Sequence, residues 1–194
     1  MKGLHDRLKD YFELTGVSEI ARRYFVMNAF DGVLTMLGVI IGAYMAGNVD
    51  RSIILGSGIS VCIAMGLSGF SGAYMTEQAE RTREMKKLES ALLIDLNGTH
   101  HDRANRFAVI FVSMIDGLSP AVGAIIVVAP FFFGSMITHE VAVYASIILA
   151  LLTLFLLGAY LAHISDERLI LHGTKMLVIG IITIITCTVV ISLI

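Results

Sequence analysis

Five long, mostly apolar stretches dominate this sequence and limit what the chain can fold into. They cover residues 25–46, 53–75, 107–133, 141–162 and 174–194. A helix needs about 20 residues to cross the roughly 30 Å hydrocarbon layer of a bilayer, and each stretch is long enough. Hydrophobic residues make up 56% of the chain and charged residues 15%, a balance outside the range of water-soluble domains. The sequence therefore predicts an all-α integral membrane protein with five transmembrane helices.

The remaining residues form an N-terminal segment, 1–24, and a connection, 76–106, so that 25–194 makes one membrane domain. The N-terminal segment mixes charges throughout and has no apolar core of a signal peptide, so we expect it to be retained. Four of its apolar residues fall at helical spacing: Leu4, Leu8, Tyr11 and Phe12. This spacing predicts an amphipathic helix at the cytoplasmic membrane surface. A poorly ordered tail is the alternative.

Lysine and arginine residues are distributed unevenly between the two sides of the predicted helices. Of the 14 in the chain, 13 lie in or beside the N-terminal segment, the 76–106 connection and the turn between the fourth and fifth stretches, and only Arg51 falls on the opposite side. Positively charged residues favour cytoplasmic loops. We therefore expect a cytoplasmic N-terminus and a C-terminus outside. Within the third stretch, Pro120 and Pro130 predict a kink or a stop.

Parts of the chain resemble each other at a nearly constant offset. The Asp-Gly pair that begins at Asp31 returns at Asp116, an offset of 85, and the tripeptide GAY that begins at Gly72 returns at Gly158, an offset of 86. Because two stretches separate equivalent positions, both halves would cross the membrane in the same direction. The pattern predicts a tandem parallel two-helix repeat followed by a fifth helix, an arrangement found in transporters. Chance similarity between apolar helices is the alternative.

Asp31 and Asp116 lie inside apolar stretches, where an aspartate costs about 2.5–3.5 kcal/mol and normally faces a cavity or a partner. Asn28 and Met27, three and four residues before Asp31, lie on or beside its helix face. One interpretation is that both carboxyl groups are protonated and hydrogen-bond between helices. The interpretation that we favour is a binding site for a divalent cation, whose release allows the carboxylates to take up protons. Such a site predicts exchange of a metal cation for protons.

The 76–106 connection contains further candidate metal ligands. Glu77, Glu80 and Glu84 share one face if the second transmembrane helix continues into the cytoplasm. Less specific candidates lie at three turns: His100, His101 and Asp102; His163, Asp166 and Glu167; and His139 with Glu140. The alternative for all of these groups is an ordinary solvated helix or turn, in which acids pair with nearby Arg and Lys residues.

Several classes of protein are disfavoured by the sequence. No nucleophile–base pair or His-rich cluster indicates an enzyme, and nothing predicts a prosthetic group. The inner loops mix basic with acidic residues, so nucleic-acid binding has no support. Cys62 and Cys187 both fall inside apolar stretches and form no disulfide framework or metal motif.

Several segments together resemble the vacuolar iron transporter family: "FDGVLTMLGVIIGAYMAG", "GLSGFSGAYMTEQAER", "SPAVGAIIVVAPFFF", "LLTLFLLGAYLAH" and "GTKMLVIGIITIIT". The likeness extends from about residue 20 over nearly the whole chain. It implies a homodimer of five-span subunits that exports Fe²⁺, and often Mn²⁺, from the cytosol in exchange for protons. Asp31 matches the family's aspartate on the translocation path. We expect this protein in the plasma membrane of a prokaryote.

The chain also departs from the family pattern. Well-studied members carry a Glu and a Met on the second span that help to bind metal; the corresponding positions here are Ser60 or Val61, and Ser68 or Gly69. We consider Asp116 the candidate for the missing charge. The 76–106 connection is short where such members have a long metal-binding domain. Two alternatives therefore stay open: a transporter or channel for another cargo, and a membrane scaffold that transports nothing.

Overall fold

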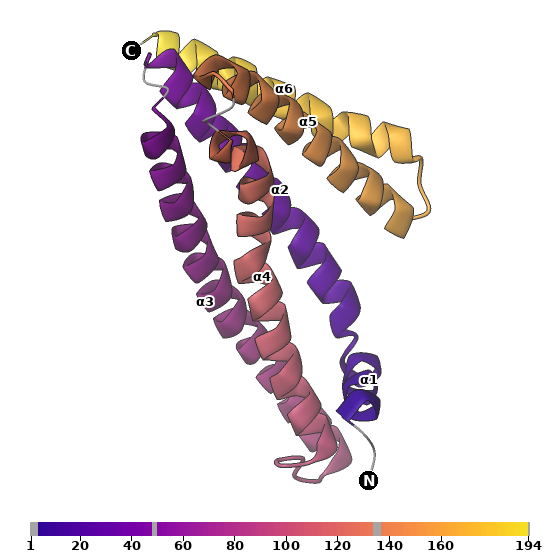
Figure 1. Cartoon of the computed structure of the whole chain (residues 1–194). Coiled ribbons are helices and arrows are strands. Elements are labelled where there is room, and N and C mark those ends of the chain that lie inside the picture. The colour runs from indigo at the N-terminus through magenta and orange to yellow at the C-terminus, as the bar shows by residue number, and fades with distance from the viewer. Residues whose placement is uncertain (1–3, 48–49, 134–136, 194) are drawn as a thin grey trace. The chain divides into compact units, whose positions relative to one another are not determined.

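The computed structural model describes residues 4–47, 50–133 and 137–193. These residues form six helices and no strand: α1 (Leu4–Thr15), α2 (Val17–Met45), α3 (Arg51–Leu92), α4 (His100–Phe132), α5 (His139–Ile164) and α6 (Leu169–Ser192) (Figure 1). The five helices α2 to α6 are long and apolar enough to cross a membrane. The prediction of an all-α protein with five helices long and apolar enough to cross a membrane is confirmed. The direction of crossing and the repeat stay predictions.

Two helices extend further than the apolar stretches. The 42 residues of α3 run past residue 75 to Leu92 without a break, so the condition under which Glu77, Glu80 and Glu84 share a helix is met. Neither proline stops α4, which contains both Pro120 and Pro130 and ends at Phe132. The sequence predicted a kink or a stop at these prolines; α4 continues through Pro120 and ends two residues after Pro130. A proline is tolerated in a transmembrane helix where neighbouring groups satisfy the backbone that it leaves unpaired.

Contacts divide the chain into two compact units. Unit 1 comprises residues 1–25 and 66–118, and unit 2 comprises residues 26–65 and 119–194. Three helices, α2, α3 and α4, contribute residues to both units.

Unit 2 holds a cluster of buried apolar side chains from several helices. Its largest members include Met36, Leu37 and Ile40 on α2, Phe131 on α4 and Leu154 on α5. Because lipid is as apolar as these side chains, dense van der Waals packing between them is what holds the helices together in this unit. The helices α5 and α6 lie side by side along their lengths (Figure 1).

Glycines set the spacing between helices in unit 2. A Cβ atom on Gly123 of α4 would lie 2.3 Å from the carbonyl oxygen of Ala29 on α2, and one on Gly158 of α5 would lie 2.6 Å from that of His172 on α6. Only a residue without a side chain allows such close approach of two backbones. Gly72, which corresponds to Gly158 in the predicted repeat, has no atom within 4 Å of an added Cβ. The two GAY segments therefore differ in packing.

Unit 1 contains the amphipathic helix α1 that the N-terminal segment predicts. Its aromatic side chains pack on the beginning of α4. Ring centroids lie 5.7 Å apart for Tyr11 and Phe107 and 5.2 Å apart for Phe12 and Phe111. Aromatic pairs at these separations add stabilisation beyond the area that they bury. The apolar face of α1 is thus used, at least in part, for contacts within the protein.

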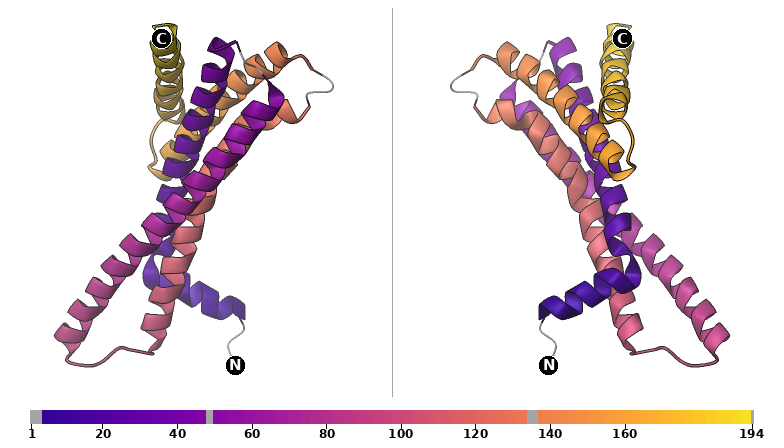
Figure 2. Two further views of the ribbon diagram at one scale, coloured as in Figure 1. Left: turned by 90° about the vertical axis from the view of Figure 1, so that its left-hand side faces the viewer. Right: turned by 90° about the vertical axis from the view of Figure 1, so that its right-hand side faces the viewer.

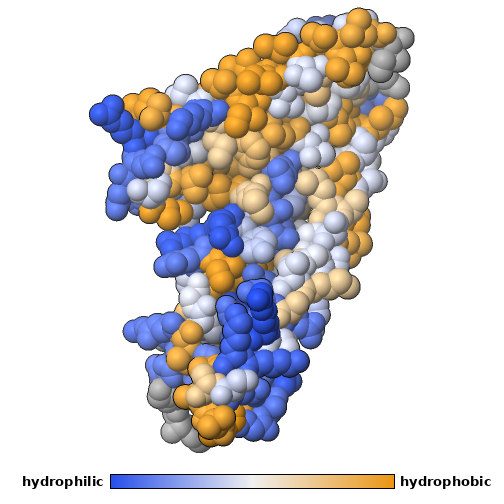
Figure 3. All heavy atoms as spheres, turned by 180° about the vertical axis from the view of Figure 1, so that it is seen from behind, coloured by the Kyte–Doolittle hydropathy of each residue, from blue (hydrophilic) through white to orange (hydrophobic). Residues whose placement is uncertain are grey.

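Much of the apolar surface remains uncovered in the single chain. Within the most apolar window of each helix, 11% of α3 and 6% of α6 is buried. Hydrophobic side chains cover much of the α5 and α6 surface, and hydrophilic ones mark the turn that joins them (Figure 3). Exposed apolar surface of this extent is covered by lipid or by another protein.

Candidate functional site

Asp31 lies on α2 in unit 2, next to a point of close helix contact. A Cβ atom on the following residue, Gly32, would lie 2.1 Å from the carbonyl oxygen of Pro120 on α4. Because successive residues point in different directions around a helix, Gly32 faces α4 while Asp31 is turned outward. The Asp31 side chain is exposed in the single chain, as is Thr35 four residues later.

The other predicted ligands on α2 surround Asp31 on the same helix. Met27, four residues earlier, is 53% exposed, and Asn28 is partly buried. Met27, Asp31 and Thr35 therefore form an exposed stripe, which we call the α2 stripe. It combines a thioether, a carboxylate and a hydroxyl group on a helix that is apolar enough to span a membrane.

Asp116 lies on α4 in unit 1 and is 6% exposed. Its neighbour Gly117 packs against α3: an added Cβ atom would lie 2.8 Å from the carbonyl oxygen of Gly66. On the α3 side, a Cβ atom on Gly69 would lie 3.0 Å from Oδ2 of Asp116. Small residues on α3 thus provide the space that the Asp116 carboxyl group occupies. Both Asp-Gly pairs place their glycine at a close helix contact.

Tyr24 connects Asp116 to a second predicted ligand. This partly buried tyrosine on α2 forms a side-chain hydrogen bond with Thr76 and interacts electrostatically with Glu77 and Asp116. The structure therefore brings Asp116 and Glu77, which are far apart in sequence, to the same tyrosine in unit 1. Sequence reasoning missed Tyr24, because a tyrosine at the start of an apolar stretch looks like an ordinary residue of the membrane interface.

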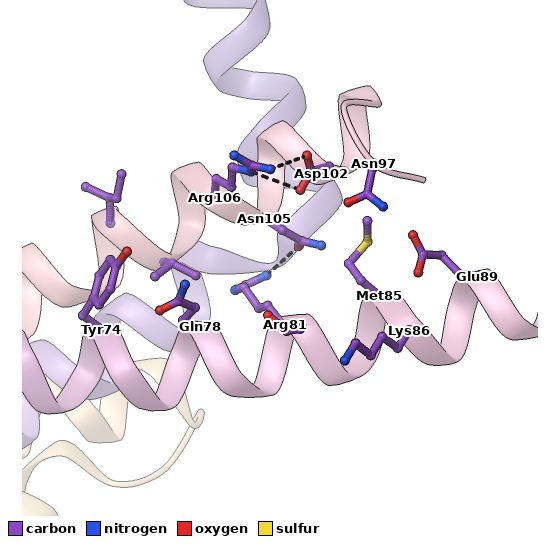
Figure 4. A pocket seen from close by; sticks show the side chains of 13 residues that line it. Tyr74, Gln78, Arg81, Met85, Lys86, Glu89, Asn97, Asp102, Asn105 and Arg106 are labelled. Atoms are coloured by element: carbon purple, nitrogen blue, oxygen red, sulfur yellow. Dashed lines mark hydrogen bonds and ion pairs between the residues drawn. The ribbon is translucent and has the colours of Figure 1, made fainter. Parts of the chain in front are cut away.

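Glu77 also forms an ion pair with a buried arginine, Arg81. Nε of Arg81 lies 3.4 Å from Oε2 of Glu77, and Nη1 of Arg81 donates a hydrogen bond of 3.1 Å to Oδ1 of Asn105 on α4 (Figure 4). Arg81 is 7% exposed. Its Nε contacts Glu77 as an ion pair but has no hydrogen-bond acceptor in the described part of the chain. A buried guanidinium group requires such partners, which explains why α3 and α4 are joined here.

The other predicted ligands of the 76–106 connection are less closely associated. Glu80 and Glu84 are exposed on α3. Asp102 binds Arg106 through an ion pair of 3.1 Å and accepts the backbone N–H of Gly98 at 3.0 Å. His100 packs on an aromatic ring of α1. The ordinary structural interpretation of the His100–Asp102 group is therefore supported.

No complete metal site forms within one chain, as far as its residues are described. Among these residues, no three His, Cys, Asp or Glu side chains are grouped to hold a metal ion. Asp31, Asn28 and Met27 belong to unit 2, whereas Asp116 and Glu77 belong to unit 1. A site that uses Asp31 together with Asp116 stays a prediction.

The fold and these residues define an α-helical integral membrane protein with carboxylates on its apolar helices. A model of the VIT family matches residues 100–192. Over 174 residues, the chain is 36% identical to "Uncharacterized protein MJ0645" of Methanocaldococcus jannaschii, and the alignment covers 87% of each protein. The chain belongs to the VIT family, the vacuolar iron transporters that the sequence resembles, which is a family of membrane metal transporters.

Proposed function

We propose that this protein exports Fe²⁺ or Mn²⁺ from the cytosol in exchange for protons. The observation that carries the proposal is the placement of Asp31 and Asp116 on helices apolar enough to span a membrane, each fixed beside a glycine at a close helix contact. Carboxylates in such helices mark ion pathways and proton relays. When a bound cation leaves, a carboxylate in a poorly solvated place takes up a proton instead.

The exposed α2 stripe supports a homodimer. Facing lipid, the Asp31 carboxyl group would carry the full cost of an aspartate in hydrocarbon. We propose that a second copy of the chain covers the stripe, so that Met27, Asn28 and Asp31 of both subunits line the translocation path. Two copies also supply more ligands than one chain does, as hard divalent cations require six or more.

Asp116 and Glu77 form the second part of the proposed path, with Tyr24 between them. Glu80 and Glu84, exposed on the same helix as Glu77, would collect cations at the cytoplasmic entrance. Their carboxylates would raise the local concentration of cations by electrostatic attraction.

The proposed cargo follows from the chemistry of the ligands. Carboxylate and amide oxygens with one thioether per subunit suit Mn²⁺ or Fe²⁺ better than Cu⁺ or Zn²⁺. The alternative is another cargo on the same scaffold, because Ser60 or Val61, and Ser68 or Gly69, stand where well-studied members carry a Glu and a Met. We place the protein in the plasma membrane of a prokaryote, in line with its archaeal relative.

The test is uptake into liposomes that contain the purified protein and a metal-sensitive dye. Fe²⁺, Mn²⁺, Co²⁺, Zn²⁺ and Ca²⁺ are offered in turn to the unaltered protein, Asp31→Asn, Asp116→Asn and the control Asp50→Asn. Asp50 is exposed, directly precedes α3 and is not among the residues of the proposed path. We expect uptake of Fe²⁺ and Mn²⁺ that both path variants lose and the control keeps. Selective uptake of a different cation would support the alternative cargo, and uptake unaffected by either path variant would contradict the proposed site.

A further inference from the structure

Unit 1 contains a cavity of about 530 Å³ between the last turns of α3 and the beginning of α4 (Figure 4). The two helices separate toward the connection that joins them (Figure 2). The volume lies within the range of small-molecule sites. The cavity lining includes the polar residues Arg81, Lys86 and Asn105, and the less polar residues Tyr74, Val109 and Ile110.

The two carboxylates in the cavity wall are already engaged in the local structure. Oε1 of Glu89 accepts the backbone N–H of Leu96 at 3.0 Å. Both carboxylate oxygens of Asp102 contact Arg106: Oδ1 accepts a hydrogen bond from Nε at 3.2 Å, and Oδ2 lies 3.1 Å from Nη2. These contacts hold the α3–α4 connection in place and leave few acceptors for a ligand.

The groups that stay available are mainly hydrogen-bond donors. Of the five donor N–H groups of Arg81, one on Nη1 donates to Asn105. Nε lies 3.4 Å from Glu77 as an ion pair but lacks a hydrogen-bond acceptor among the described residues. The Lys86 ammonium group makes no ion pair with any residue that the structure describes. A ligand for this side of the cavity must therefore be rich in acceptors and negatively charged, as a phosphate group is.

The position of the cavity along α3 adds an apolar requirement. Tyr74 belongs to the end of the apolar part of this helix, whereas the charged part begins just after it. Ile110, on the facing side, is 51% exposed. The cavity thus combines an apolar wall with donors that lie at the charged end of the helix. A free phosphate ion uses the donors alone, whereas a phospholipid uses both parts.

We infer that this cavity binds the phosphate group of an anionic phospholipid, with its acyl chain against Tyr74, Val109 and Ile110. Basic pockets between transmembrane helices on the cytoplasmic side bind such headgroups in other proteins. The inference is independent of the proposed cargo and of Asp31. The proposed ligand is a structural lipid, bound where α3 and α4 separate from each other.

The test is lipid-dependent thermal stability of the full-length protein in detergent. The melting temperature is followed while phosphatidylglycerol, phosphatidylcholine or inorganic phosphate is added. We expect phosphatidylglycerol to stabilise the unaltered protein at lower concentration than phosphatidylcholine. Lys86→Gln should raise the apparent dissociation constant for phosphatidylglycerol about fivefold. Lys87→Gln, the matched control on the neighbouring position outside the cavity wall, should leave it unchanged.

Two results would overturn the inference. Equal effects of Lys86→Gln and Lys87→Gln would place lipid binding elsewhere on the surface. Stabilisation by inorganic phosphate, with no difference between the two lipids, would assign the donors to a free anion. Because Lys86 is exposed, its replacement should fold normally, which Arg81→Gln need not do. Lipid binding by each variant is also measured directly, by native mass spectrometry, to separate it from changes in stability.

Discussion

Gly32 and Gly117 follow the two aspartates of the apolar helices, and each lies where its helix almost touches another. An added Cβ atom would lie 2.1 Å from a backbone oxygen at Gly32 and 2.8 Å from one at Gly117. A backbone cannot move aside as a flexible side chain can. The glycine therefore fixes the distance between helices, and with it the position of the neighbouring carboxyl group.

Replacement of Gly32 by alanine tests this close contact. The methyl group would force α2 away from α4, and overpacking of this kind costs about 1–3 kcal/mol in the free energy of unfolding. Gly72→Ala is the control, because an added Cβ there meets no atom within 4 Å. Thermal unfolding in detergent should show a lower melting temperature for Gly32→Ala and an equal or higher one for Gly72→Ala, since alanine favours helix. Equal melting temperatures would contradict the close contact.

Tyr24→Phe tests the connection between Asp116 and Glu77. The change removes the hydroxyl group that bonds Thr76 and leaves the ring packing in place. Loss of one hydrogen bond of about 1 kcal/mol corresponds to roughly a fivefold effect, so we expect metal transport about fivefold slower in liposomes. Tyr160→Phe, at an exposed position on α5, serves as control. Unchanged transport by Tyr24→Phe would remove Tyr24 from the proposed path.

Among the helices, those that depend on local composition alone were predictable from the sequence. The five transmembrane helices follow from long apolar stretches, and α1 follows from its amphipathic spacing. The continuity of α4 through Pro120 was not predictable, because neighbouring helices decide whether a proline stops a helix.

The candidate site was predictable to a smaller extent. Asp31 and Asp116 stood out because a charge is costly inside an apolar helix. Glu77 stood out because it shares a helix face with two other glutamates. The roles of Tyr24 and Arg81 depend on residues from other helices, so no local pattern indicated them. Contacts between side chains of different helices can be identified only once the fold is known.

The connection between α3 and α4 should depend on pH. Two hydrogen bonds from Asn97, through its backbone N–H and its side chain, hold the pKa of Asp95 below its ordinary value of 3.8. A lowered pKa in the folded state means that these bonds stabilise the connection above pH 3.8 and are lost as the pH falls through the lowered value. Hydrogen exchange at the Asn97 amide should therefore be slower in the unaltered protein than in Asp95→Ala at pH 6. A difference that stays undiminished however far the pH is lowered below 3.8, while the protein remains folded, would contradict this interpretation.

At the scale of the whole molecule, uncovered surface is the main feature. The α2 stripe and the apolar faces of α3 and α6 are exposed in a single chain. Lipid suits a purely apolar face such as that of α6, whereas the carboxyl group of Asp31 needs a polar neighbour. This contrast is why we assign a second subunit to the α2 stripe and lipid to α6.

Cysteine cross-linking in membranes tests the assigned dimer face. In a background with Cys62 and Cys187 replaced by serine, Thr35→Cys on the α2 stripe should form a disulfide between two copies under mild oxidation. Val189→Cys, on the exposed face of α6, should stay monomeric on a non-reducing gel. Cross-linking at position 189 without any at position 35 would assign the dimer to the other face.

Exchange of metal for protons is most directly tested by metal flux under an imposed pH difference alone. Liposomes containing the protein carry equal Mn²⁺ concentrations inside and outside, and a proton gradient is then applied. We expect net Mn²⁺ movement toward the side with the higher proton concentration, reversal when the gradient is reversed, and loss of both in Asp31→Asn. Mn²⁺ that stays at equilibrium under either gradient, while the same liposomes still carry Mn²⁺ down its own gradient, would contradict proton exchange.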